Sequence, residues 1–137
     1  MAGEKQFEKK VERYLESVGI YQNTTRSQSY KTELRGWFFK VWGGGYQSAG
    51  VPDLIVCANG VFISVELKNV TGRPSDLQKR NTELINQAGG LGVILYPSGF
   101  KQFKTIIEEV LFCNSLTAGL AHSYATLSNT NCGILKS

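Results

Sequence analysis

The stretch VPDLIVCANGVFISVELKN, residues 51–69, decides the fold. On both sides of Asn59-Gly60, apolar residues alternate with other residues, as they do in strands buried on one face. Asn-Gly between two such runs is the strongest short signal for a two-residue β-hairpin turn. Residues 53–57 and 61–67 are therefore predicted to be neighbouring antiparallel strands.

The register of this hairpin brings acidic residues together. If the turn has two residues, Ala58 pairs with Val61, and Asp53 then falls opposite Glu66 with Cβ atoms about 5 Å apart. Lys68 follows Glu66 by two positions and points to the same face of the sheet. Two carboxylates this close repel unless one takes a proton or a cation lies between them. We therefore expect a divalent cation at this face.

A cation held by Asp53 and Glu66 can bind a phosphate oxygen and a water molecule together. It lowers the pKa of that water and offsets the charge that develops during phosphodiester hydrolysis. Lys68 can orient the water or stabilise the same charge, so no covalent nucleophile is needed. The backbone carbonyl of Leu67 can supply a further oxygen ligand. The apolar neighbours along both strands, Leu54, Val56, Ile63, Val65 and Leu67, are predicted to point into the core.

The rest of the sequence predicts an α/β fold. In chain order the expected elements are an amphipathic helix at 3–18, a loop or weak edge structure at 20–35, a strand at 36–42, a capped helix from Ser75 to about Ala88, a strand at 91–96 and a final helix to Leu111. A helix connects strands 61–67 and 91–96, so these two strands should be parallel. The sequence thus predicts a mixed sheet flanked by helices.

Two segments divide the chain. Residues 1–112 are expected to form one domain, and residues 113–137, which carry a single charge, a C-terminal extension. The pattern of this extension leaves a loose tail, a short hairpin and a dimer element open. The glycine-rich residues 43–50 are interpreted as a connector or as a mobile loop for substrate entry beside Asp53.

The composition of the 137-residue chain narrows the chemistry. Three dispersed cysteines argue against a disulfide framework, and a single histidine argues against a zinc site or a histidine-based triad. Oxygen ligands favour Mg²⁺ or Mn²⁺. A net charge of +4 hints at nucleic acid. No apolar stretch reaches the length of a membrane span and no signal segment opens the chain, so we expect a soluble cytoplasmic protein without a membrane partner.

The residues quoted above carry a resemblance to a known family. Pro52-Asp53 followed by Glu66-x-Lys68 resembles the motif of PD-(D/E)xK nucleases, and further segments resemble the virus-type replication-repair nuclease domain, VRR-NUC. These segments are KQFEKKVERYL (5–15), AGVPDLIV (49–56), VELKN (65–69), GRPSDLQ (72–78) and INQAGGLGVILYP (85–97). The resemblance covers about residues 3–111 and excludes the extension. Many members come from phages and prophages, which implies a bacterial host cell.

The resemblance implies a restriction-endonuclease-like fold, with metal ligands at Asp53 and Glu66 and a catalytic lysine at Lys68. It also implies an acidic residue on the first helix near the metal. Glu8 is our choice, with the alternatives Glu4 and Glu12 one turn to either side.

The resemblance further implies a glutamine after the second catalytic strand, and Gln78 fits this position. Gln78 also fits the capping box that begins at Ser75, so a role in catalysis and a role in capping both stay open.

Structural interpretations remain beside the functional ones. Asp53 could be a turn residue at the start of a strand, and Glu66 with Lys68 could form an exposed polar face. Glu8 could be an ordinary solvated helix residue. Lys40 is interpreted as a phosphate contact or as an edge lysine that limits aggregation.

Other basic and aromatic residues are open as well. Arg73, Lys79 and Arg80 could bind backbone phosphates or form a solvated basic face. Trp37 and Trp42 are interpreted as core or interface residues rather than base-stacking platforms.

The function expected is a metal-dependent DNA endonuclease. The small phage members of the family resemble Holliday-junction resolvases, and this resemblance implies selectivity for branched DNA. These members typically act as homodimers, so a homodimer is expected as well. The alternatives are a catalytically inactive DNA-binding module of the same fold, a nicking or restriction-type enzyme, and an RNA nuclease.

Overall fold

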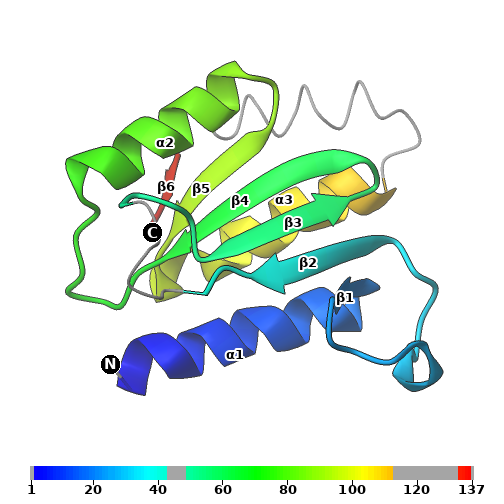
Figure 1. Cartoon of the computed structure of the whole chain (residues 1–137). Helices are drawn as coiled ribbons and strands as arrows, with labels where there is room; N and C mark the ends of the chain where they lie inside the picture. The colour runs from blue at the N-terminus through cyan, green and yellow to red at the C-terminus, as the bar shows by residue number, and fades with distance from the viewer. Residues whose placement is uncertain (1, 43–48, 113–132, 137) are drawn as a thin grey trace.

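A computed structural model describes residues 2–42, 49–112 and 133–136 and shows an α/β fold (Figure 1). The helices are α1 (Ala2–Ser17), α2 (Asp76–Gln87) and α3 (Phe100–Phe112), with single 3₁₀ turns at Ser27–Ser29 and Pro97–Gly99. The strands are β1 (Ile20–Gln22), β2 (Gly36–Lys40), β3 (Leu54–Ala58), β4 (Val61–Leu67), β5 (Leu91–Leu95) and β6 (Ile134–Leu135).

The strands form one six-stranded mixed sheet in the order β1-β2-β3-β4-β5-β6. The three central strands β2, β3 and β4 form an antiparallel meander, in which β3 is antiparallel to both β2 and β4. β1 runs parallel to β2, while β5 runs parallel to both β4 and β6. The predicted crossover through α2 and the parallel pairing that follows from it are therefore confirmed.

The register predicted for the central hairpin is also confirmed. Ala58 pairs with Val61, and every later pair of β3 and β4 follows from that first one. Asn59 and Gly60 have φ angles of +50° and +80°. A two-residue turn of the type that matches the strand twist requires positive φ at both positions, and Asn-Gly adopts this conformation at low cost.

The hydrophobic core lies on the sheet face covered by α1 and α3. The five apolar residues predicted to face it, Leu54, Val56, Ile63, Val65 and Leu67, are fully buried. Phe7 of α1 and Phe100 of α3 meet edge to face, with ring centroids 5.8 Å apart. Because the core occupies this face, the alternate residues of β3 and β4 are left for the opposite face. Among the described residues, no helix has the length and apolar character needed to cross a membrane.

On that opposite face, α2 packs closely against β5. A Cβ atom at Gly92 would lie only 2.8 Å from the carbonyl oxygen of Thr82, so the absence of a side chain at Gly92 permits this approach. Thr82 is buried, whereas Leu77 and Leu84, on the apolar side expected for this helix, are 50% and 43% exposed. Fewer residues of α2 are therefore buried against the sheet than its apolar pattern indicates.

The structure departs from the sequence interpretation at two further places. Trp37 and Trp42 are 46% and 82% exposed, so the core interpretation is wrong for both, while the interface interpretation stays a prediction. The end of the C-terminal extension adds strand β6 beside β5, a possibility absent from our three interpretations. Residues 43–48 and 113–132, on which the loop and tail predictions fall, lie outside the described residues.

Candidate metal and catalytic site

Asp53 is held firmly at the entrance to β3. Its backbone N–H donates to the carbonyl of Val65 (3.0 Å), and its carbonyl accepts from the N–H of Val41 (2.8 Å). Its carboxylate oxygen Oδ2 accepts from the N–H of Leu67 at 2.7 Å. Asp53 is therefore tied to β4 through both backbone and side chain, which is a more constrained position than a simple turn residue needs.

Glu66 lies on the same face of β4 and is almost completely buried, with 6% of its side chain exposed. Its Oε1 atom accepts a hydrogen bond from Nε2 of Gln78 at 2.8 Å. Its Oε2 atom is buried, and no donor from the described part of the chain reaches it. A buried carboxylate oxygen without a donor is rare in proteins. A proton shared with Asp53, whose hydrogen bond raises the pKa of Glu66, or a cation would satisfy it.

The two carboxyl groups perturb each other's titration. The pKa of Glu66 is raised to about 8, mainly by burial and next by the neighbouring charge of Asp53, against the opposing effect of Lys68. Burial also raises the pKa of Asp53, although the N–H of Leu67 counteracts this. At neutral pH without a cation, Glu66 is therefore mostly protonated, as expected where two carboxyls share a poorly solvated site.

Lys68 completes this group. Its ammonium lies 3.7 Å from Oε1 of Glu66, and only 14% of its side chain is exposed. Its backbone N–H donates to the carbonyl of Leu95, which fixes the end of β4 against β5. The interpretation of Glu66 and Lys68 as an exposed polar face is therefore wrong.

Gln78 forms the capping box and also contacts the buried Glu66, while its role in catalysis stays a prediction. Its Oε1 atom accepts from the N–H of Ser75 (2.9 Å), while the Ser75 hydroxyl accepts from the N–H of Gln78 (3.1 Å), so the capping box is confirmed. Its Nε2 atom is the group that donates to Glu66. One amide side chain thus joins the first turn of α2 to the buried carboxyl.

A second contact from α2, between Asn81 and Gly50, escaped the sequence analysis. Nδ2 of Asn81 donates to the carbonyl of Gly50 at 2.8 Å, just before Pro52-Asp53. Gly50 has φ +83°, and a Cβ atom there would meet Leu77 at 2.8 Å. Gly50 is the one sequence signal for this contact, because the positive φ angle and the close approach of Leu77 both favour a residue without a side chain.

Glu8 lies near the site but is engaged elsewhere. Its Oε1 atom is 2.7 Å from the ammonium of Lys40, and this hydrogen bond raises the pKa of Lys40. Glu8 is close enough for its charge to raise the pKa of Asp53, whereas the charge of Glu4 acts on Glu66. The choice of Glu8 as the helix acid, and the phosphate contact proposed for Lys40, stay predictions.

The donors present fit a loosely held hard cation. Within the described ranges, no three His, Cys, Asp or Glu side chains form a complete metal-binding group. Asp53 and Glu66 are the two carboxylates that converge, and Oε2 of Glu66 is the atom that a cation would satisfy. Mg²⁺ commonly takes one or two carboxylates and completes its shell with water and substrate phosphate. The ligand role of the Leu67 carbonyl stays a prediction.

Three predicted nucleic-acid contacts surround the N-terminus of α2. Arg73 and Arg80 are exposed, and Lys79 has its ammonium 3.9 Å from the Asp76 carboxylate. The N-terminus of a helix favours anions through its free N–H groups and its dipole. This placement accommodates phosphate binding and a solvated basic surface equally, so both interpretations stand.

We predict that the metal-free protein loses stability as the pH rises from about 5 to about 8. The Glu66 carboxyl titrates near 8 when folded, against an ordinary value of 4.5. Between these values the folded state binds more protons than the unfolded state, so the free energy of unfolding falls with rising pH and levels off above about pH 8. Urea unfolding in EDTA should show a weaker pH dependence for Glu66→Gln. Parallel pH curves for both proteins would contradict the burial of a protonated Glu66.

A second prediction separates the two roles of Gln78. Ser75→Ala and Gln78→Ala each remove half of the capping box, and each should cost about 1 kcal/mol in the free energy of unfolding. Only Gln78→Ala should raise the pKa of Glu66, because it removes a donor to the charged carboxylate. NMR titration of the Glu66 carboxyl carbon measures this shift. An equal shift in both variants would mean that Gln78 acts on Glu66 only through the helix.

Comparisons with known proteins leave the family open. No family model, no curated protein and no solved structure matches this chain. The likeness to VRR-NUC nuclease domains therefore rests on the sequence segments quoted above, and the function has to be argued from the site itself.

Proposed function

We propose that this protein is a metal-dependent endonuclease that hydrolyses phosphodiester bonds in DNA. The observation that carries the proposal is the pairing of Asp53 and Glu66 on one sheet face, with Lys68 beside them and a buried Glu66 oxygen without a donor. Burying two carboxyl groups together costs stability, which functional sites tolerate and purely structural sheets rarely do.

The side chains have separate tasks in this mechanism. Asp53 and Glu66 would hold Mg²⁺ or Mn²⁺, which when bound supplies Lewis acidity toward a phosphate oxygen and a water molecule. Lys68 places a positive charge beside the developing charge on the phosphate or orients the attacking water. Gln78 donates to Glu66 and thereby favours the ionised form that a cation requires.

The architecture supports the finer assignment to a restriction-endonuclease-like fold. A helix, a three-stranded antiparallel meander, a second helix and a parallel strand follow each other as α1, β2, β3, β4, α2 and β5. The proposed catalytic residues lie where β3 begins and β4 ends, as the resemblance implies.

An inactive DNA-binding module is less well supported by the site. Carboxylates beside a DNA backbone repel its phosphates, so a pure binding surface would gain nothing from Asp53 and Glu66. The exposed cations Arg73 and Arg80 suit either function. Selectivity for branched DNA comes from the resemblance alone and needs a substrate panel to decide it.

We predict that Mg²⁺ or Mn²⁺ supports cleavage, with a four-way junction cut faster than flap, single-stranded, linear duplex or RNA substrates. Glu66→Gln and Asp53→Asn should lower the cleavage rate by about a thousandfold or more through metal loss, and Lys68→Ala by about a hundredfold or more. Glu33→Gln and Lys101→Ala, which change distant exposed residues, are the matched controls. Wild-type rates in the three site variants would exclude the mechanism, and absence of cleavage with retained binding would favour the inactive module.

We also propose a homodimer, because a four-way junction offers two equivalent strands and a two-fold dimer presents two sites to them. Sedimentation at the concentrations that support junction cleavage should give twice the mass of one chain. Binding should weaken steeply with salt, since phosphate contacts release counterions. A monomer that cuts both strands symmetrically would contradict the dimer.

A further inference from the structure

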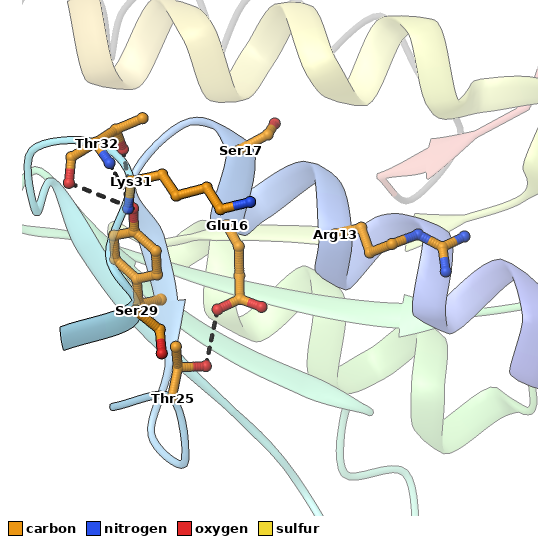
Figure 2. A pocket seen from close by; sticks show the side chains of 8 residues that line it. Arg13, Glu16, Ser17, Thr25, Ser29, Lys31 and Thr32 are labelled. Atoms are coloured by element: carbon orange, nitrogen blue, oxygen red, sulfur yellow. Dashed lines mark hydrogen bonds between the residues drawn. The ribbon is translucent and has the colours of Figure 1, made fainter. Parts of the chain in front are cut away.

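A pocket of about 580 Å³ opens between the second half of α1 and the segment that joins β1 to β2 (Figure 2). Its lining consists of the side chains of Arg13, Glu16, Ser17, Tyr21, Thr25, Ser29, Lys31 and Thr32. None of these residues belongs to the site proposed above. The volume lies in the range of pockets that hold small organic ligands.

Hydrogen bonds to Tyr21 and Glu16 preform the pocket. The hydroxyl of Tyr21 accepts from the backbone N–H groups of Lys31 (3.1 Å) and Thr32 (3.0 Å), which curls the segment around the tyrosine. At the other side, the hydroxyl of Thr25 donates to Oε2 of Glu16 at 2.8 Å and ties the segment to α1 (Figure 2). A ligand would therefore enter a shape that already exists, which lowers the entropic cost of binding.

The charges of the lining point to a ligand with two kinds of group. Arg13 and Lys31 are exposed cations, and neither forms an ion pair in the described part of the chain. Figure 2 shows the Arg13 side chain pointing away from Lys31 and Glu16, so Lys31 is the cation that contacts an anion such as a phosphate ester, and Arg13 adds positive charge nearby. Glu16 is the only acid in the lining and has one oxygen taken by Thr25. Its carboxylate disfavours a bare anion and favours a ligand that also carries N–H or O–H donors.

We propose that this pocket binds one deoxynucleotide unit, with its phosphate beside Lys31, a donor group of its base beside Glu16, and Arg13 adding positive charge at the rim. A deoxynucleotide combines a phosphate, an amino-bearing base and an apolar sugar in a volume that suits the pocket. Tyr21, buried in the wall and stacked on Tyr30 with ring centroids 3.8 Å apart, gives the pocket a rigid aromatic side.

The connection of this pocket to a cleaved strand rests on the proposed function. Glu8, whose charge reaches Asp53, and Glu16 lie on the same helix, about 12 Å apart along its axis. Successive nucleotides rise by about 3.4 Å per strand. We infer that a strand bound at Asp53 and Glu66 continues along α1 for several nucleotides toward the pocket.

NMR titration in EDTA tests the binding without cleavage. Labelled protein is titrated with deoxyadenosine monophosphate, with inorganic phosphate and with a five-nucleotide single strand. Shifts at Glu16, Thr25 and Thr32 should saturate with the monophosphate at micromolar to millimolar Kd, more weakly with phosphate and more tightly with the strand. No shift at these residues would overturn the proposal. Equal affinity for the monophosphate and the strand would overturn the connection to a cleaved strand.

Variants test the chemistry of the pocket. Lys31→Ala should raise the Kd for the monophosphate about tenfold, because it removes a charged contact, and Arg13→Ala should raise it less, because Arg13 points away from Lys31 and Glu16. Arg26→Ala, an exposed cation of the same segment outside the lining, is the matched control and should leave the Kd unchanged. Equal weakening by Arg26→Ala would mean general charge attraction and would refute the site. Because these residues are exposed, melting temperatures should stay unchanged.

One further variant separates this proposal from the nuclease proposal. Glu66→Gln should abolish cleavage and keep monophosphate binding at Glu16 and Thr32, because the pocket does not use Glu66. If the wild-type protein binds the monophosphate at the pocket and cleaves no substrate, the pocket proposal holds and the nuclease proposal is wrong. If it cleaves DNA and shows no shift at the pocket, the nuclease proposal holds and the pocket proposal is wrong.

Discussion

The two-residue turn at Asn59-Gly60 is the constraint on which the site depends. Strand side chains alternate between faces, so a slip of one residue in this hairpin would move every side chain of one strand to the other face. The observed register sends Leu54 and Val65 into the core and leaves Asp53 and Glu66 on the opposite face. The same apolar burial that stabilises the hairpin therefore also fixes the spacing of the two carboxyl groups.

This arrangement has an electrostatic cost that the surrounding residues offset. Glu66 is buried beside another carboxyl, and its pKa is raised to about 8 as a result. The Leu67 N–H, the Gln78 amide and the Lys68 ammonium each provide a favourable contact to one of the two acids. The first comes from the last residue of β4, Lys68 follows directly after β4, and the Gln78 amide requires α2 to approach the sheet closely. The glycine at position 92 thus matters to the site, because it allows that approach.

The local parts of the site could be predicted from sequence, because they follow from short-range periodicity. The hairpin register and the Ser75–Gln78 capping box each involve residues only a few positions apart, and both are confirmed. The pairing of Glu8 with Lys40 and the addition of β6 to the sheet were not predicted. They depend on how distant segments approach each other, and no spacing in a single sequence encodes that. The capping role of Gln78 was predicted, whereas its hydrogen bond to Glu66 was not, because that contact depends on how α2 packs against β4.

Helix α1 connects the two regions of the molecule that carry unusual polar groups. Its apolar stripe, Phe7, Val11 and Leu15, is buried in the core and packs the helix against the sheet. Three acidic residues of this helix have distant partners. The charge of Glu4 acts on Glu66, Glu8 contacts Lys40 and acts on Asp53, and Glu16 lines the pocket. Acids placed one turn apart along a helix repel each other and gain nothing locally. Their partners therefore explain their positions better than helix stability does: a lysine of β2 for Glu8, and a threonine of the pocket wall for Glu16.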